Sequence, residues 1–245
     1  MPHTACGLGD PRDTYLKLLT IDTSTNACSV ALTCGGELVA EYLLNQGKTM
    51  SGRLLECVDV VLTGAGLTVT DLEGFGVAVG PGSFTGLRIG AATVKGLALA
   101  TGKPVAGFSS LATLAMNLPW ACFPVCPMFD ARKGEVYAAL YDCRGLPETL
   151  LADCVVSPAA FLDRITDATI FIGEGAIRYR ELIETRLGER AHFAPPYANS
   201  PRASSGAQLA RDLLLRGQDI PLATLAPLYI RPSEAELAKL KRESL

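Results

Sequence analysis

The residues that could do chemistry are few, and the strongest group is a glycine-rich stretch, Gly80-Pro81-Gly82-Ser83-Phe84-Thr85-Gly86. A short apolar run over residues 75–79 precedes it, and a long apolar segment over residues 84–100 follows. A strand, a glycine turn and a helix in this order are typical of an anion-binding loop, because glycines admit a ligand and the helix N-terminus offers free amides. The spacing matches neither the dinucleotide pattern nor a P-loop. The stretch therefore predicts either a phosphate-binding loop or a turn that caps a closely packed helix.

Two aspartates stand where a nucleotide-binding protein could use them. Asp22 and Asp130 each end an apolar run, and each is followed by a turn. A hairpin that holds phosphate usually has a glycine close to its aspartate, and none lies close to Asp22. We expect both aspartates to hydrogen-bond their own turns. The alternative is a vestigial or working nucleotide site, in which an ATPase or phosphotransferase would use Asp22 and Asp130.

Groups for general-base or metal chemistry are scarce. The two histidines are His3 and His192, and histidine is the usual general base and metal ligand. Eight cysteines lie at irregular positions without a CxxC pair, which favours reduced structural thiols over a zinc site. The lone tryptophan, Trp120, is expected to pack in the core. These patterns predict no catalytic residues, no metal site and no cofactor, and they argue against a peptidase.

The composition is that of a globular protein with a sizeable core. Of 245 residues, 49% are hydrophobic and 19% are charged, and the formal net charge is −3. A protein that binds nucleic acid by itself normally has a basic face, so any RNA contact is expected to come through a partner. No apolar run reaches the length of a membrane span, and residues 1–13 lack a signal-peptide pattern. We expect a cytoplasmic protein with a disordered lead over residues 1–16.

The remaining elements follow from periodicity. Strands are expected over residues 18–22, 28–33, 37–44, 75–79, 124–131, 135–141, 149–156 and 169–172. Helices are expected over residues 51–63, 84–100, 158–165, 177–187 and 204–216, with a terminal helix capped by Ser233. Thr70 and Glu73 have the spacing of a capping box.

The order of these elements repeats. Residues 21–32 correspond to residues 129–140, and the pair Gly80 and Gly82 corresponds to Gly173 and Gly175. Each half reads β-β-β-α-β. Two such units, each with an aspartate at the tip of its first strand, are the plan of the duplicated actin-like (ASKHA, ribonuclease H-like) α/β two-lobe fold. We expect the first lobe over residues 17–103, joined by a C-terminal helix over residues 232–245, and the second lobe over residues 104–231.

The two helices of the first half carry the clearest sign of a partner. The helix over residues 84–100 has Arg88 and Lys95 as its only charges, and small residues recur along it. A helix that is apolar almost all round must be covered on more than one side. Either the helix over residues 51–63 or a second protein provides that cover. Arg88 opposes the helix dipole, so we expect it to serve a carboxylate or phosphate elsewhere, or an intramolecular salt bridge.

Four motifs resemble those of one family. They are IDTSTNACSVAL at residues 21–32, GPGSFTGLRIG at residues 80–90, FDARKGEVY at residues 129–137 and PLYIR at residues 227–231. The chain resembles the TsaB (YeaZ) family over residues 18–236, and the second motif is highly specific to that family. The resemblance implies a pseudoenzyme: a non-catalytic subunit of the bacterial machinery that transfers a threonylcarbamoyl group to the adenosine next to the anticodon of certain tRNAs.

The resemblance also implies partners. The related metalloprotein TsaD has metal-binding histidines where this sequence has Ser109, Ser110 and Leu114, so the metal site is expected to be missing. The implied partners are TsaD through the first-lobe helices, the ATPase TsaE, tRNA indirectly through the complex, and a second copy when the chain is isolated. The residues expected at the interface are Leu54, Leu55, Val58, Leu62, Leu87, Val94 and Leu97, with Arg88 at the rim.

Overall fold

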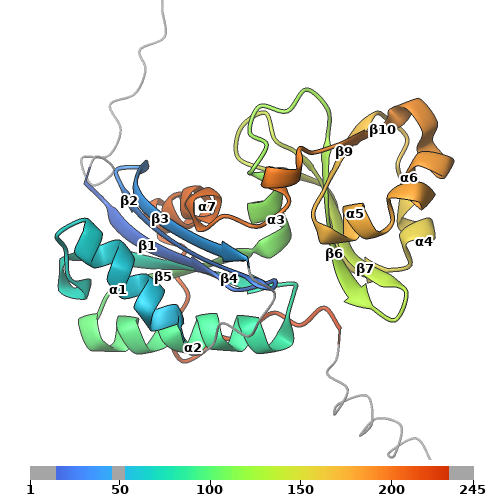
Figure 1. The fold of residues 1–245 in the computed structure, drawn as a ribbon. Coiled ribbons are helices and arrows are strands. Elements are labelled where there is room, and N and C mark those ends of the chain that lie inside the picture. The colour runs from blue at the N-terminus through green and yellow to red at the C-terminus, as the bar shows by residue number, and fades with distance from the viewer. Residues whose placement is uncertain (1–14, 46–52, 232–245) are drawn as a thin grey trace, which may run out of the picture.

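The structure, a computed structural model, describes residues 15–45 and 53–231. The helix expected over residues 232–245, and most of the lead expected over residues 1–16, lie outside these ranges. The described residues form two lobes, each built on a five-stranded mixed sheet with helices on both faces (Figure 1). No helix within the described ranges is long and apolar enough to cross a membrane.

The first sheet has the strand order β3-β2-β1-β4-β5. Neighbours β3, β2 and β1 are antiparallel, whereas β4 runs parallel to β1 and β5 parallel to β4. Its strands are β1 (Lys17–Asp22), β2 (Ala27–Cys34), β3 (Glu37–Asn45), β4 (Gly74–Gly80) and β5 (Val105–Ser109). The helices packed on it are α1 (Leu54–Gly64), α2 (Phe84–Thr101) and α7 (Ala203–Leu215), with the 3-10 helix η1 (Val69–Asp71) before β4.

The second sheet has the order β10-β9-β6-β7-β8. Strands β6, β7 and β8 are antiparallel neighbours, and β9 runs parallel to β6. The strands are β6 (Val125–Arg132), β7 (Glu135–Asp142), β8 (Glu148–Val156), β9 (Thr169–Ile172) and β10 (Ala191–Phe193). The helices are α3 (Ser110–Ala115), α4 (Pro158–Leu162), α5 (Glu174–Arg178), α6 (Arg180–Leu187), η2 (Gly188–Arg190) and η3 (Pro196–Ala198). This lobe repeats the pairing of the first, so the expected duplication is confirmed.

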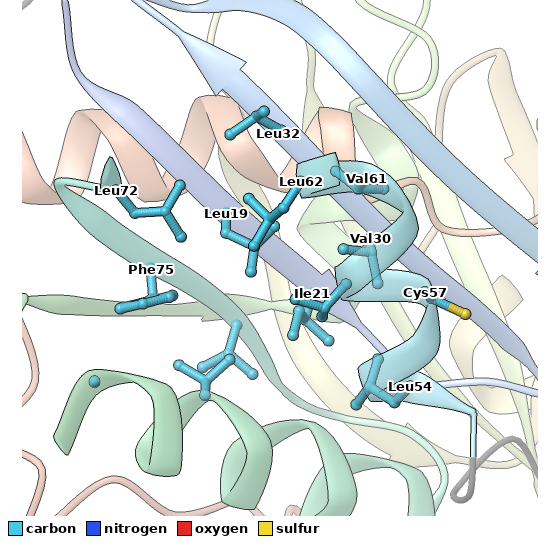
Figure 2. Close-up of a cluster of buried hydrophobic side chains, with 14 of the residues drawn as sticks. Leu19, Ile21, Val30, Leu32, Leu54, Cys57, Val61, Leu62, Leu72 and Phe75 are labelled. Carbon is cyan, nitrogen blue, oxygen red and sulfur yellow. The ribbon is translucent and has the colours of Figure 1, made fainter. Parts of the chain in front are cut away.

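The main core of the first lobe lies between its sheet and the helices α1 and α2 (Figure 2). In β1, Leu19 and Ile21 point to this side, and Leu18 points to the other side, where α7 packs. Successive side chains of a strand alternate between faces. The apolar stripe of α1, which includes Leu54 and Leu62, completes the core. Cover on both faces explains why the central strands are apolar along their length.

The second lobe is layered in the same way. In β6, Val125 and Phe129 belong to the cluster that α3 covers. The alternate residues Cys126 and Met128 belong to the cluster under α4, α5 and α6. Both faces of this sheet are therefore buried as well.

Three elements, β5, α3 and β10, are not among those expected from the sequence. The chain passes from β5 into α3 without a loop, because Ser109 ends the strand and also caps the helix by accepting a hydrogen bond from the amide of Ala112 at 3.2 Å. The helix expected over residues 177–187 is two helices, α5 and α6, that meet at Tyr179. The first boundary has no separate loop, because Ser109 serves both elements. The second is a change of direction within one helical stretch.

The expected capping box is also corrected. The capping box lies at the start of η1 and is formed by Thr68 and Asp71, not by Thr70 and Glu73. The carboxylate of Glu73 accepts a hydrogen bond from the amide of Lys17 at 2.6 Å. It therefore ties the start of β1 to the start of β4.

The division of the chain between the two sheets differs from the expected boundary between residues 103 and 104. Strand β5 pairs with β4 in the first sheet, and α7 packs on the same sheet. After α7 the chain stays on the first lobe, where the amide of Ile220 donates to the carbonyl oxygen of Val105 at 2.8 Å and Leu225 enters the core. The second sheet is thus inserted between two parts of the first lobe.

The expectation that Trp120 packs in the core is wrong. Its side chain is 76% exposed, in the loop between α3 and β6. Its backbone has a φ of 62°, and its amide donates to the carbonyl oxygen of Cys143 at 2.7 Å. That hydrogen bond fixes the loop in a left-handed conformation that turns the indole outward.

Candidate functional site

A cleft of about 750 Å³ lies between the lobes. Its walls are the turn after β1, the start of α2, the β6–β7 hairpin, the start of α5 and residues 228–231. The expected site residues that line it are Pro81, Gly82, Ser83, Phe84, Thr85, Leu87, Arg88 and Asp130. Asp22, Gly80 and Gly86 lie outside the set of described residues that line it.

The glycine-rich stretch is packed against the turn that follows β1. A Cβ atom at Gly82 would lie 2.2 Å from the backbone oxygen of Ser24, and one at Gly86 would lie 2.0 Å from that of Thr23. The amide of Ser83 donates to the same Ser24 oxygen at 2.6 Å, and its hydroxyl caps α2. Close backbone contact therefore requires these glycines. This favours the turn that caps a helix over the phosphate-binding loop.

Gly80 makes room for the end of the described chain. Its φ is +127°, and a Cβ atom there would lie 2.7 Å from the carbonyl oxygen of Leu228. The amide of Leu228 donates to the carbonyl oxygen of Val79 at 2.7 Å. Three residues later, Arg231 forms an ion pair with Glu135 of the second lobe. We call residues 228–231 the C-terminal strap, because they join the two lobes beside the cleft.

Asp22 is buried beneath the turn. Its Oδ1 accepts hydrogen bonds from the amide and the hydroxyl of Ser24 at 2.9 and 2.6 Å. Its Oδ2 is buried and has no hydrogen-bond partner among the described residues. Burial raises the pKa of Asp22 to about 6, although the hydrogen bonds from Ser24 act in the opposite direction. The carboxylate therefore hydrogen-bonds the turn that follows β1, as expected for an aspartate at the end of a strand.

Asp130 occupies the equivalent position in the second lobe but has a different environment. Its Oδ1 accepts a hydrogen bond from the amide of Arg132 at 3.0 Å, and its Oδ2 forms an ion pair with Arg178 at 2.8 Å. Both aspartates thus bond the amide two residues later. The structure does not bring them together as lining residues of one site, because Asp130 lines the cleft and Asp22 does not.

Arg88 points to aromatic rings. Its guanidinium carbon lies 3.8 Å from the centroid of the Phe84 ring, and its Nε donates to the Tyr229 hydroxyl at 2.8 Å. The rings of Phe84 and Tyr229 stack with centroids 4.7 Å apart. Within the described ranges Arg88 has no ion pair. The intramolecular salt bridge weighed for it is therefore not found there.

Most of the expected interface residues lie in the core of the first lobe. Five of the eight are no more than 6% exposed: Leu54, Val58, Leu62, Leu87 and Val94. Leu97 is half-buried against the same core, whereas Leu55 is 61% exposed and Arg88 is exposed. The buried residues cannot reach a partner while the lobe is folded. The apolar stripe that identifies an amphipathic helix marks its own core face, and for this reason it selects residues of the core.

The exposed faces of the same helices hold apolar side chains that are not among the expected interface residues, apart from Leu55. Val60 of α1 is 56% exposed, and Leu99 of α2 is 67% exposed. The small residues Ala92 and Gly96 are exposed on α2. The sequence pattern that indicates such residues is an apolar or small side chain on the side of the helix opposite its core-facing stripe. We call Leu55, Val60, Ala92, Gly96 and Leu99 the outer helix face.

At the positions where the resemblance implies lost metal ligands, one side chain is hydrogen-bonded and two are buried. The Ser109 hydroxyl donates to Asp153 Oδ2 at 2.6 Å. Ser110 and Leu114 are fully buried. Across residues 15–45 and 53–231, no three His, Cys, Asp or Glu side chains are grouped so that they could hold a metal ion.

Two repeated mixed sheets, with a cleft between their first hairpins, define a protein of the duplicated actin-like class. Component A of (R)-2-hydroxyglutaryl-CoA dehydratase from Acidaminococcus fermentans shares this fold. The TM-score is 0.50 at 15% identity, over 80% of this chain and 98% of that chain. The expected fold class is confirmed.

Sequence comparison is more specific. The family model "TsaD: tRNA N6-adenosine threonylcarbamoyltransferase" matches residues 37–239. The chain is 33% identical over 225 residues to the tRNA threonylcarbamoyladenosine biosynthesis protein TsaB of Bacillus subtilis, covering 90% of this chain and 96% of TsaB. YeaZ from Pseudomonas aeruginosa superposes with a TM-score of 0.74 at 30% identity, over 87% of this chain and 99% of YeaZ. The chain belongs to the TsaB (YeaZ) branch of the family that this model describes.

Proposed function

We propose that this chain is a non-catalytic subunit of the machinery that makes threonylcarbamoyladenosine in tRNA, and that it binds and activates a TsaD-type enzyme. The observation that carries the proposal is the 33% identity to a protein named for this biosynthesis over 90% of the chain. The machinery acts on tRNA, so the chain works in the cytoplasm. TsaE acts on the assembled complex, and tRNA contacts the chain through that complex.

The assignment of a non-catalytic role is supported by the residues at the cleft and at the end of β5. The backbone of Thr23 and Ser24 fills the space beside Gly82 and Gly86 of the glycine-rich stretch. The positions of the histidines in TsaD are taken by side chains with structural contacts, such as the buried Leu114 in the second-lobe core. These residues stabilise the fold, and none of them is placed to do acid-base chemistry.

The outer helix face is the proposed contact with TsaD. Apolar side chains as exposed as Leu55, Val60 and Leu99 are typical of interaction sites when they lie together. The small residues Ala92 and Gly96 let a partner helix approach α2 closely. In the isolated chain the same face pairs with a second copy. Arg88 lies on α2 one turn before Ala92 and contributes to the rim.

The test is co-purification with the TsaD protein of the same cell. Leu55→Glu places a charge in the centre of the proposed contact and is expected to weaken retention of TsaD by at least about a hundredfold, the loss typical of a hot-spot residue. Ile177→Glu is the matched control, because Ile177 is 59% exposed on α5 of the second lobe and Leu55 is 61% exposed. Circular dichroism is expected to show both variants folded.

Undiminished retention of TsaD by Leu55→Glu would contradict the interface, as would equal loss in both variants. Val58 is a poor choice for this experiment, since it is 5% exposed and a charge there would unfold α1. Function is read separately. Depletion of the chain is expected to lower the threonylcarbamoyladenosine content of tRNA, measured by nucleoside mass spectrometry, and an unchanged content would refute the proposed role.

A further inference from the structure

Within the described ranges the chain crosses between the lobes at three places. The first crossing has no linker, because Ser109 ends β5 of the first sheet and Ser110 begins α3, which packs on the second. The second is the segment between η3 and α7, over residues 199–202. The third is the C-terminal strap, which reaches the β6–β7 hairpin. The lobes can change their relative position only if these crossings turn, since a hinge is a few residues that absorb a change in backbone angles.

A carboxylate holds the first crossing. The Ser109 hydroxyl donates to Asp153 Oδ2 at 2.6 Å, and the Tyr141 hydroxyl donates to the other oxygen of the same carboxylate. Because Tyr141 lies in β7 and Asp153 in β8, the end of the first sheet is bonded to two strands of the second. Tyr141 is 3% exposed, and burial raises its pKa, so its hydroxyl keeps the proton that makes this bond. We call these three residues the carboxylate brace.

An amide side chain holds the second crossing. Asn117 follows α3, and its Nδ2 donates to the carbonyl oxygens of Ala198 and Ser200 at 2.8 and 2.7 Å. Its Oδ1 accepts a hydrogen bond from the hydroxyl of Ser205 in α7 at 2.8 Å. Both N–H donors of the amide are thus used, and its oxygen is bonded to a helix of the first lobe. We call Asn117 and these three partners the amide brace.

Helices α3 and α7 pack closely between the two braces (Figure 1). Gly206 of α7 is buried, and a Cβ atom there would lie 2.7 Å from the ring of Phe108 in β5 and 3.4 Å from Cγ2 of Thr113 in α3. The backbone of α7 therefore lies against the crossing from β5 to α3. Interiors packed at this density have no space to take up a displaced helix, so a rotation that moves α3 toward α7 produces overlap.

The strap joins the lobes at a different place. Leu228 is bonded to Val79 of the first sheet, while Arg231 donates to the carbonyl oxygen of Ala131 at 3.0 Å and pairs with Glu135. The strap lines the cleft, whereas no residue of either brace is among the described residues that line it. Two attachments define an axis about which the lobes could still rotate. A third attachment away from that axis prevents this rotation.

We propose that the two braces and the strap lock the lobes in one relative orientation, so that the chain is a single rigid body whose cleft neither opens nor closes. A partner then meets the outer helix face and the second lobe in one fixed arrangement. Binding to a rigid surface costs less ordering entropy than binding to two mobile lobes. This property goes beyond the proposed function and does not depend on it.

The experiment measures the distance between two nitroxide labels in the full chain by pulsed electron paramagnetic resonance. The labels replace Thr85 of α2 and Ile177 of α5, which are exposed side chains of opposite lobes. They are attached to ketone amino acids, so the native cysteines stay unlabelled. The labelled chain is diluted with an excess of unlabelled chain, which removes distances between copies.

The test variant combines Tyr141→Phe, Asn117→Ala and Arg231→Gln, which removes a bond from each brace and from the strap. Asp163→Ala is the matched control, because the ion pair of Asp163 with Arg186 lies within the second lobe. Circular dichroism is expected to show both variants folded. If the combined variant unfolds, Tyr141→Phe with Arg231→Gln takes its place, because it keeps the buried ring and the amide brace.

The parent and the control are expected to give one narrow distribution of distances. The test variant is expected to give a distribution at least about twice as wide, since motion of whole domains is slow and collective and adds to the motion of the labels. Three results would each overturn the proposal: a broad or two-peaked distribution in the parent, a shift of its mean distance on addition of ATP and Mg²⁺, or a folded test variant as narrow as the parent.

Discussion

The two lobes share one plan and differ where the parallel strand of each repeat gives way to a helix. In the first lobe, α2 continues for 18 residues. In the second lobe the corresponding turn leads to α5, of 5 residues, and then to α6, of 8 residues. The glycines serve both lobes alike, because a Cβ atom at Gly82 would collide with Ser24 and one at Gly175 would collide with Met128. The common feature is the packed turn, and the long helix with an exposed apolar face belongs to the first lobe.

The two strand-end aspartates also share a position and differ in their electrostatic environment. Asp22 and Asp130 stand at matching positions, and each bonds the amide two residues later. Asp22 is 2% exposed and forms no ion pair with any described residue, whereas Asp130 is paired with Arg178. A shared backbone plan therefore does not give a shared electrostatic environment.

The largest effect is expected for Gly86→Ala. The new Cβ would lie 2.0 Å from the backbone oxygen of Thr23, so α2 and the turn must separate. We expect a loss of about 4 kcal/mol in the apparent free energy of unfolding, which is exceptional for a single substitution. Gly175→Ala, with its nearest atoms at 2.9 Å, is expected to lose less. Urea titration of both variants measures the difference, and a larger loss for Gly175→Ala would show that the first turn is the more adaptable.

A smaller effect is expected from the pH dependence contributed by Asp22. Its pKa is raised from 3.8 to about 6 in the folded chain, so the folded state binds a proton that the unfolded state releases between these values. Stability from this group is therefore greatest at low pH and falls as the pH rises to about 6, by about 3 kcal/mol on an order-of-magnitude basis. Above that pH the contribution is constant.

Asp22→Asn should remove this pH dependence, and Asp130→Asn should leave it in place. The measurement is thermal unfolding of the three proteins between about pH 4 and pH 7, a range that contains the fall in stability between the unfolded and the folded pKa of Asp22. Asp130→Asn breaks an ion pair whose arginine side chain is 60% exposed, so its own cost is expected to be about 1 kcal/mol or less. A parent slope that persists in Asp22→Asn would assign the titration to another group.

The smallest effect is expected for Gly96→Ala. Gly96 lies within α2, and nothing lies within 4 Å of the position of a new Cβ. Alanine in place of glycine in a helix interior is expected to stabilise the chain by about 0.5–1 kcal/mol. The same added methyl group lies on the outer helix face, so retention of TsaD is expected to weaken while the thermal midpoint rises. A drop in the thermal midpoint would contradict the open environment of Gly96.

The strands and most helices could be predicted because their apolar periodicity is local, and the duplication could be predicted because its halves share motifs. β5 and α3 were missed because both elements are short and no loop separates them, since Ser109 ends the strand and caps the helix. The apolar stripe alone does not select the exposed residues of the proposed interface. Whether a leucine of α1 faces the sheet or solvent depends on the layers around it: Leu54 is 1% exposed, and its neighbour Leu55 is 61% exposed.

The place of α7 could not be predicted either, because a helix does not encode the lobe on which it packs. Its range was expected over residues 204–216 and is observed as Ala203–Leu215. The contacts that place it are distant in sequence, such as the hydrogen bond from the amide of Ala203 to Ser29 Oγ at 2.8 Å. The cleft depends on similar long-range contacts, including those of the C-terminal strap.

The insertion of the second lobe into the first has a consequence for synthesis on the ribosome. The first sheet lacks its cover on one face until α7 has been translated, and its core lacks Leu225 until still later. The inserted lobe, in contrast, is continuous in the chain from α3 to η3. The first lobe therefore begins to emerge before the second lobe but completes its folding after it. Its folding requires contacts between residues far apart in the sequence, and such contacts form slowly. A nascent chain that stalls before residue 203 exposes the apolar face that α7 would cover.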